Sequence, residues 1–216
     1  MALVMLDYDG VIVNTLEIHV SNLLEAFHEN AFYKVNSAEE ILKLYERNVY
    51  QSLADLGLND LQINQIFDSY EKKQNMYLDS IEIFNGIADS LREIARKNKI
   101  YIITSNVAST VIYVLKKHGL TWIENVLGSE TEKSKIKKIR KVMTWHPELT
   151  AYYVGDTKGD IFEGQTAGAY TIGVAWGWHD VQKLLESCPD YIVHTPQELA
   201  HLFQSNSDLI KSELTY

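Results

Sequence analysis

The chain has 216 residues, of which 46% are hydrophobic and 23% are charged, and this composition is that of an ordinary globular protein. The formal net charge of −9 argues against a surface that binds nucleic acid, because such a surface needs a positive field. The single cysteine, Cys188, excludes an intramolecular disulfide and fits a reducing compartment. No window reaches about 18 uncharged apolar residues, so we expect a cytoplasmic protein without a membrane partner.

The N-terminal part of the sequence predicts one strand followed by a long helical stretch. The apolar run at residues 3–6 is typical of a strand buried on both faces. From about residue 16 to about residue 80, hydrophobic residues recur at helical spacing, and Ser37 with Glu40 predicts a capping box. This stretch is too long for an ordinary crossover between strands. We therefore predict an all-helical cap subdomain at residues 16–81, inserted after the first strand.

The rest of the chain alternates between short apolar runs and amphipathic helical patterns. The runs show little alternation of polar and apolar residues, as in a parallel sheet that is covered on both faces. They lie at residues 100–104, 152–155, 171–175 and 191–193. We therefore predict that residues 1–15 and 82–216 form an α/β core with a doubly wound, Rossmann-like parallel sheet.

Two pairs of aspartates follow two of the predicted strands. Asp7 and Asp9 come after the first strand, and Asp156 and Asp160 come after the strand at residues 152–155. Because the carboxyl ends of parallel strands share one edge, the pairs can converge, and they would repel one another without a cation. Mg²⁺ prefers such carboxylates. Helix capping and turn formation are the other explanation for each pair alone, but two such pairs favour a magnesium site.

Hydroxyl and lysine side chains near two further helix starts fit a phosphate site. Thr104, Ser105 and Asn106 follow a third strand and open a helix, where anions bind well, although simple capping is an alternative. Lys135 lies at the start of another helix and could neutralise a phosphate. It belongs to a basic run that is typical of a solvated helix face, and Lys133 is the other candidate for the site lysine.

The ordered motifs resemble those of the haloacid dehalogenase superfamily over essentially the whole chain. The motifs are Asp7-Tyr8-Asp9-Gly10-Val11, Thr104-Ser105-Asn106, Lys135 and Gly155-Asp156-Thr157-Lys158-Gly159-Asp160. The helical insertion, the segment at residues 83–86 and the segment at residues 173–178 are similar to features of the phosphoglycolate phosphatase-like branch, which has a small C1-type cap. Two positions differ from many relatives, because Val11 stands where threonine is commoner and Asn14 stands where aspartate is frequent.

The resemblance implies a Mg²⁺-dependent phosphomonoester hydrolase. Asp7 would attack phosphorus to give a phospho-aspartyl intermediate, and Asp9 would act as the general acid and base. The metal would be held by Asp7, the backbone carbonyl of Asp9 and Asp156, with Asp160 as a direct or indirect partner.

The same resemblance implies the residues that bind the phosphate and the substrate. Thr104 and Lys135 would stabilise charge on the transferring oxygens. Gly10, Ser105 and Asn106 would complete the phosphate site. The expected partner is a small phosphorylated metabolite, and we expect a monomer, because a capped enzyme needs no second subunit to close its site.

Other activities use similar residues. A phosphomutase of the β-phosphoglucomutase type shares all four motifs and differs mainly in how its cap handles water and a second hydroxyl. A dehalogenase needs no carboxylate at position 9, where this chain has Asp9. A receiver domain of a signalling protein also combines aspartates, a hydroxyl and a lysine, but the helical insertion and the spacing of Asp7 and Asp9 argue against it.

The sequence leaves the choice of substrate open. Arg47, within the predicted cap, could meet a substrate carboxylate or a second phosphate, or could be an ordinary surface arginine. Trp176, Trp178 and His179 follow a predicted strand and could line the mouth of the site or pack beneath a loop. We expect the cap to decide which phosphate ester binds.

Overall fold

The computed structural model describes residues 1–204, and its centre is a six-stranded parallel sheet. The strand order is β3-β2-β1-β4-β5-β6, so the chain moves outward from β1 in one direction and then returns to the other side of it. This arrangement is the predicted doubly wound sheet. The strands are β1 (Ala2–Leu6), β2 (Lys99–Ile103), β3 (Asn125–Leu127), β4 (Thr150–Gly155), β5 (Tyr170–Val174) and β6 (Tyr191–Val193).

Helices cover both faces of the sheet, which explains why its strands are apolar throughout. One hydrophobic cluster joins the sheet to α5 (Ile87–Ala95), α6 (Ala108–Lys117) and α10 (Pro196–Gln204). A second cluster joins the opposite face to α7 (Lys135–Trp145) and α8 (Lys158–Ala167). The short helix α9 (Val181–Leu185) follows β5.

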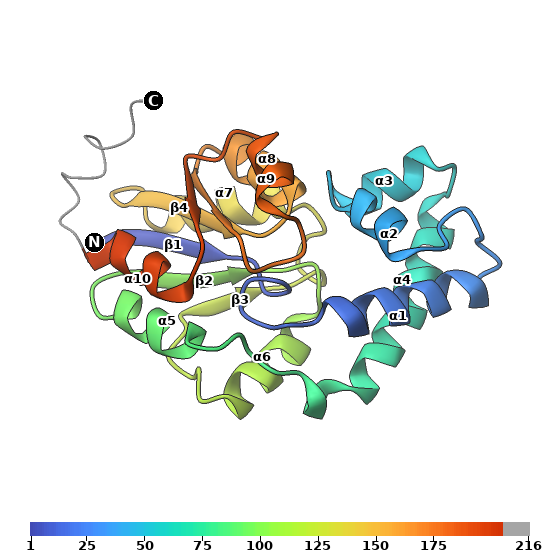
Figure 1. Cartoon of the computed structure of the whole chain (residues 1–216), viewed down its shortest axis with the longest axis horizontal. Coiled ribbons are helices and arrows are strands. Elements are labelled where there is room, and N and C mark those ends of the chain that lie inside the picture. Colours follow the sequence, from blue (N-terminus) through green and yellow to red (C-terminus); the bar gives the residue numbers. More distant parts are fainter. Residues whose placement is uncertain (205–216) are drawn as a thin grey trace.

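The residues between β1 and α5 form a separate group of helices with its own hydrophobic core. Figure 1 shows α1, α2, α3 and α4 beside the sheet rather than on either of its faces. The fully buried side chains of Phe27, Ile41 and Leu53 lie in their core. We refer to this group as the cap. Its elements are α1 (Leu16–Glu29), α2 (Ala38–Leu44), α3 (Val49–Asp55) and α4 (Asp60–Met76), followed by the 3-10 turn η1 (Leu78–Ser80).

The two chain segments that connect the cap to the sheet pair with each other. Val13 and Ile83 form an isolated antiparallel bridge, and the N–H of Asn14 donates to the carbonyl of Glu82 at 2.9 Å. The exposed side chain of Asn14 makes no hydrogen bond within residues 1–204, so its link to Glu82 is through the backbone. The predicted boundaries at residues 16–81 lie beside this pairing and stay a prediction.

Several elements differ from the sequence predictions for local reasons. Strand β3 was not predicted, because it has only three residues and no period to recognise. The helices α9 and α10 were also not predicted. Ser37 caps α2 as expected, but the capping box is incomplete, since the Glu40 carboxylate accepts from the N–H of Asn36 instead. Residues 205–216, which end the predicted core, lie outside the described residues.

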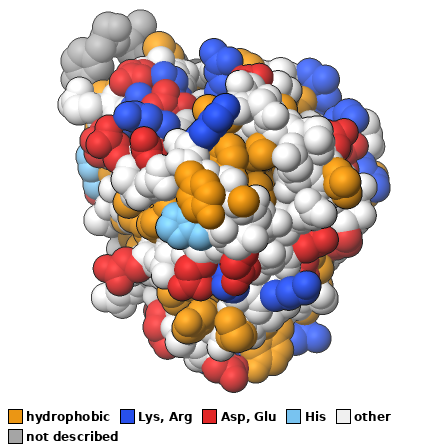
Figure 2. Space-filling view, turned by 90° about the vertical axis from the view of Figure 1, so that its right-hand side faces the viewer, with side chains coloured by type: hydrophobic (Ala, Val, Ile, Leu, Met, Phe, Trp, Pro, Cys, Tyr) orange, Lys and Arg blue, Asp and Glu red, His pale blue; other side chains and the backbone are white. Residues whose placement is uncertain are grey.

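The described residues contain no candidate membrane-spanning helix, and the face shown in Figure 2 has no large basic patch. No helix within residues 1–204 is both long and apolar enough to cross a membrane. On the face shown in Figure 2, acidic, basic and hydrophobic side chains are interspersed without a continuous basic patch.

Candidate active site

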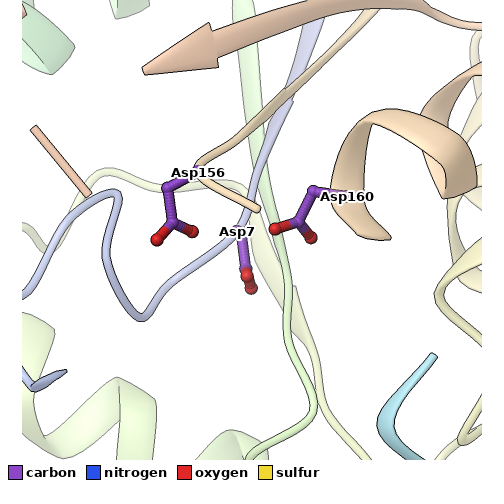
Figure 3. A group of neighbouring side chains, drawn as sticks. All are labelled: Asp7, Asp156 and Asp160. Atoms are coloured by element: carbon purple, nitrogen blue, oxygen red, sulfur yellow. The ribbon is translucent and has the colours of Figure 1, made fainter. Parts of the chain in front are cut away.

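Three aspartate carboxylates meet at the edge of the sheet where the direction of winding reverses. Asp7 directly follows β1, Asp156 directly follows the neighbouring strand β4, and Asp160 lies in the first turn of α8. One oxygen of each lies within 4.8 Å of the others, and all three side chains are buried. Figure 3 shows them pointing toward a common space. The structure thus brings three of the four predicted aspartates into one group.

Lys135 is the cation within this group. Its ammonium lies 2.7 Å from Oδ2 of Asp7 and 2.7 Å from Oδ1 of Asp160, and its side chain is buried. Ser134 caps the start of α7 and so fixes the helix from which Lys135 projects. Lys133 instead lies outside the site, where it contacts the side chain of Asn64 and the ring of Tyr50. The geometry therefore selects Lys135 from the two candidate lysines.

One lysine does not neutralise three buried carboxylates. Burial raises the pKa of Asp7 to about 8 against the effect of Lys135, and burial with the charges of Asp160 and Asp7 raises the pKa of Asp156 well above its usual range. Burial also acts to raise the pKa of Asp160, but Lys135 and the hydrogen bonds from Thr157 outweigh it and lower that pKa. Three ionised carboxylates would therefore need more positive charge than Lys135 supplies.

Asp156 supplies the observation that tests whether a divalent cation fits. Its Oδ2 accepts from the N–H of Trp178 at 2.7 Å, whereas its buried Oδ1 has no hydrogen-bond partner among residues 1–204. Buried polar atoms of native proteins almost always have a partner, so this oxygen is available as a ligand. An all-oxygen group of carboxylates is the donor set that Mg²⁺ prefers. The residues present therefore fit a magnesium ion.

Gly10 and Gly177 leave room for the Asp156 carboxylate. A Cβ atom at Gly10, whose φ is +71°, would lie 1.9 Å from Oδ2 of Asp156. A Cβ atom at Gly177 would lie 2.1 Å from Cβ of Asp156. Gly10 thus lies against a candidate metal ligand, and its predicted contact with phosphate stays a prediction.

Asp9 lies apart from the three-carboxylate group and is held by two donors. Its Oδ1 accepts from the hydroxyl of Thr15 at 2.7 Å, and its Oδ2 accepts from the side-chain amide of Asn106. Burial raises the pKa of Asp9 even though both hydrogen bonds act to lower it. Asp9 still lines the same cavity as Asp7, as does Ser105. The Asp9 side chain therefore faces the cavity, while its role in proton transfer and its backbone carbonyl as a metal ligand stay predictions.

Thr104 is fully buried at the end of β2, and a lysine that the sequence reasoning missed supports it. The Thr104 hydroxyl accepts from the N–H of Asn106 at 3.1 Å, and the Thr104 carbonyl accepts from the ammonium of Lys138. Burial and the nearby charge of Lys135 lower the pKa of Lys138 to about 8. Lys138 lay hidden in the basic run, although its position three residues after Lys135 places it on the same buried face of α7.

The cavity above these groups lies between the sheet and the cap. Arg47 lines it but is exposed, so the predicted substrate contact of Arg47 stays a prediction. Trp178 lines the cavity, whereas the indole N–H of Trp176 donates to the carbonyl of Val11. His179 accepts from the N–H of Lys158 and contacts the carbonyl of Leu42 through its other nitrogen. Trp178 therefore belongs to the cavity wall, while Trp176 and His179 have packing roles.

The cap contacts the sheet domain directly over the acidic motif. The N–H of Gly159 donates to the carbonyl of Tyr45 at 3.0 Å, and Glu46 lies between the ammonium groups of Lys158 and Lys183. A Cβ atom at Gly159 would lie 2.6 Å from the Tyr45 carbonyl oxygen and 2.8 Å from the carbonyl oxygen of Arg47. The glycine of this motif is therefore required for close approach of the cap.

A comparison with known families agrees with this arrangement. The family model described as haloacid dehalogenase-like hydrolase matches residues 4–174 of the chain. The chain belongs to this family. Both Asp7, directly after β1, and the acidic motif after β4 lie within the matched range.

Individual members of the haloacid dehalogenase-like family are similar over nearly their full length. A phosphoglycolate phosphatase of Synechococcus elongatus is 24% identical over 204 residues, which cover 92% of this chain and 95% of that protein. The pyrophosphatase PpaX of Bacillus pumilus is 25% identical over 209 residues, covering 91% and 93%. A solved haloacid dehalogenase-like hydrolase from Streptococcus pneumoniae has a TM-score of 0.77 and 26% identity, covering 94% of this chain and 99% of its own. The chain is a phosphatase of the phosphoglycolate phosphatase-like branch of its family.

Replacing Gly159 by alanine should hold the cap away from the sheet domain of this haloacid dehalogenase-like phosphatase. The added methyl group meets two backbone carbonyls, which cannot move aside as a flexible side chain would. We expect kcat/KM for p-nitrophenyl phosphate to fall about tenfold or more, because small misplacements of a closing element cost that much. Gly173→Ala, whose Cβ would meet only the ends of side chains at 3.3 Å or more, is the control. Equal activity of the two variants would contradict this account.

Proposed function

We propose that the protein is a Mg²⁺-dependent phosphomonoester hydrolase that works through a phospho-aspartyl intermediate on Asp7. The observation that carries the proposal is the convergence of Asp7, Lys135 and the unpartnered oxygen of Asp156 in one cavity. The substrate is a small phosphorylated metabolite, and the enzyme acts as a cytoplasmic monomer without a nucleic-acid or membrane partner. The negative net charge and the interspersed surface charges support this choice of partner.

Two hydrogen bonds fix the orientation of the proposed nucleophile, Asp7. Its Oδ1 accepts from the N–H of Tyr8 at 2.8 Å, and its Oδ2 is bonded to Lys135. Mg²⁺ held by Asp7 and Asp156, with Asp160 beside them, would neutralise the buried carboxylates and the phosphoryl oxygens. The Asp7 carboxylate then forms a bond to phosphorus while the ester P–O bond breaks, which gives an acyl phosphate.

Asp9 handles the protons of both half-reactions. In the first, its carboxyl group gives a proton to the oxygen of the leaving alcohol, and burial, which raises the pKa of Asp9, favours the protonated form that this step needs. In the second, the Asp9 carboxylate takes a proton from the water that attacks phosphorus. Inorganic phosphate leaves and the Asp7 carboxylate is restored. Thr15 and Asn106 fix the orientation of Asp9 through both steps.

Replacing Asp7 by asparagine should abolish turnover, because the amide cannot form the acyl phosphate. We expect kcat/KM for p-nitrophenyl phosphate in Mg²⁺-containing buffer to fall by about 10³-fold or more. The control is Asp68→Asn, which makes the same change at an exposed aspartate of α4. It should leave turnover within twofold of wild type, which corresponds to a change of about 0.4 kcal/mol in the activation free energy. Turnover near wild type in the Asp7 variant would rule out this nucleophile.

The two candidate lysines provide a matched comparison of the charge at the phosphate. Lys135→Met removes the cation bonded to Asp7 and Asp160, so kcat should fall about 10²- to 10³-fold. Lys133→Met removes a lysine two positions away whose contacts are with Asn64 and Tyr50, and it should change kcat less than threefold. A larger loss in the Lys133 variant would reverse the assignment.

Metal binding can be tested without measuring activity. We expect Mg²⁺ to raise the melting temperature of the wild-type protein by binding only the folded state. In Asp156→Asn this rise should be lost, because the oxygen without a partner no longer carries a charge. In EDTA the variant should be at least as stable as wild type, because an acid whose pKa is raised on folding destabilises the folded state at neutral pH, and asparagine removes that cost. A Mg²⁺-dependent rise of the same size in both proteins would place the metal elsewhere.

A further inference from the structure

The cap contributes a mostly aromatic and uncharged wall to the active-site cavity. If the phosphoryl group lies against Asp7, on the sheet side, this wall faces the leaving group of the substrate. The aromatic rings of the cap pack on one another, and the Tyr50 and Phe67 ring centroids are 4.7 Å apart. His19 also packs on Trp178 of the sheet domain, with the ring centroids 4.4 Å apart. Such contacts fix the positions of the wall's polar atoms before a ligand arrives.

Two tyrosine hydroxyls in this wall share one histidine. Nδ1 of His19 lies 2.7 Å from the hydroxyl of Tyr70, and Nε2 lies 2.7 Å from the hydroxyl of Tyr45. Burial lowers the pKa of His19 to about 3, so the ring is neutral and has one N–H and one acceptor nitrogen. One tyrosine therefore donates to the ring, and the other accepts from it. The accepting tyrosine retains a hydroxyl proton that can be donated to a ligand.

Gln74 and Trp178 add further neutral hydrogen-bonding groups. The side chain of Gln74 lines the cavity and is 4% exposed, and its amide makes no hydrogen bond to any described residue. The indole N–H of Trp178 is buried and likewise has no partner within residues 1–204. An amide both donates and accepts hydrogen bonds, which matches a hydroxyl group. These groups are therefore suited to a ligand that bears neutral oxygen atoms.

The charged side chains that line the cavity, from the cap and from the sheet domain, disfavour an anionic leaving group. Glu71 and Glu163 line the cavity, and Glu163, whose pKa is raised by burial, accepts a hydrogen bond from the neutral amide of Asn48 at 2.9 Å. Within the described chain, the lysine and arginine side chains that line the cavity are Lys135, which is already bonded to two carboxylates, and the exposed Arg47. A carboxylate or second phosphate on the leaving group would meet two glutamates and one solvated arginine.

We propose that the preferred substrate is a phosphate ester of an uncharged, hydroxyl-bearing alcohol, whose hydroxyl groups bind to Gln74 and to the Tyr45–His19–Tyr70 group. This inference rests on the proposed phosphatase activity and specifies its substrate class. It sets this chain apart from relatives whose names indicate phosphoglycolate or pyrophosphate, because both of those substrates have an anionic leaving group.

The proposal can be tested on the wild-type protein in Mg²⁺-containing buffer with pairs of phosphate esters. The two members of each pair differ in whether the leaving group carries a carboxylate or an uncharged hydroxyl group. The first pair is 2-hydroxyethyl phosphate and 2-phosphoglycolate, and the second is glycerol 3-phosphate and 3-phosphoglycerate. Phosphate release should give a kcat/KM that is at least about tenfold higher for the member of each pair whose leaving group is uncharged, because Glu71 and Glu163 offer a carboxylate no positive partner. Pyrophosphate should be hydrolysed no better than the acidic members.

A variant then tests whether Gln74 recognises hydroxyl groups. Gln74→Leu keeps the size of the side chain and removes its amide. We expect kcat/KM for glycerol 3-phosphate to fall at least fivefold more than kcat/KM for p-nitrophenyl phosphate, which has no hydroxyl group on its ring. A purely structural role of Gln74 would lower both values equally, and that result would overturn its assignment. Arg47→Gln is the second variant, and the preference for neutral substrates should survive it.

The outcomes separate this inference from the function on which it rests. A ratio below tenfold, or a preference for the acidic members that disappears in Arg47→Gln, overturns the neutral leaving group and makes Arg47 an anion anchor. Hydrolysis of p-nitrophenyl phosphate without hydrolysis of either pair also overturns it. Failure to hydrolyse p-nitrophenyl phosphate itself would contradict the proposed phosphatase activity instead.

Discussion

The excess of negative charge at the end of β1 and β4 is the constraint on which the rest of the site depends. Three buried carboxylates face one lysine, and the buried Oδ1 of Asp156 has no partner in the described chain. Within residues 1–204, the surrounding residues leave room for these carboxylates and do not add a second positive charge beside them. Gly10 and Gly177 leave space for the Asp156 carboxylate, and the N–H of Trp178 binds its other oxygen. Such a costly group is retained where a cation completes it.

The same acidic motif also connects the site to the cap. Asp160 both accepts from Lys135 and caps the start of α8 through Thr157, so one side chain fixes the helix and the charge pattern. Gly159, between them, lies against carbonyls of the cap. The cap then brings the Tyr45–His19–Tyr70 group and Gln74 over the carboxylates. Chemistry and substrate choice therefore come from two layers that meet at one short loop.

Much of the fold and of the charged centre could be predicted from the sequence, because these features are local. The strands other than β3 are continuous apolar runs, and the aspartates stand directly after two of them. The neighbouring positions of β1 and β4 then bring Asp7 and Asp156 together. Lys135 was preferred to Lys133 because it stands at the start of a helix, and its contacts with Asp7 and Asp160 now separate the two lysines. The family match confirms the resemblance to the haloacid dehalogenase superfamily.

The remaining features depend on contacts between distant parts of the chain. Lys138 looked like one lysine of a solvated run, and only the packing of α7 shows that it bonds to the Thr104 carbonyl. His19, Tyr45 and Tyr70 are unremarkable residues of three separate cap segments until the cap folds. The spacing of residues along the helices does not show that the hydroxyls of Tyr45 and Tyr70 will both bond to the ring of His19. The wall that faces the leaving group was therefore invisible to sequence patterns.

A crystal structure grown with Mg²⁺ and beryllium fluoride, which imitates a phosphoryl group on a carboxylate, tests the central claim most directly. The account predicts beryllium bonded to a carboxylate oxygen of Asp7, and a magnesium ion in contact with both Asp7 and the Oδ1 atom of Asp156 that has no partner within residues 1–204. Beryllium on another side chain, or a magnesium ion bound away from Asp156, would contradict it.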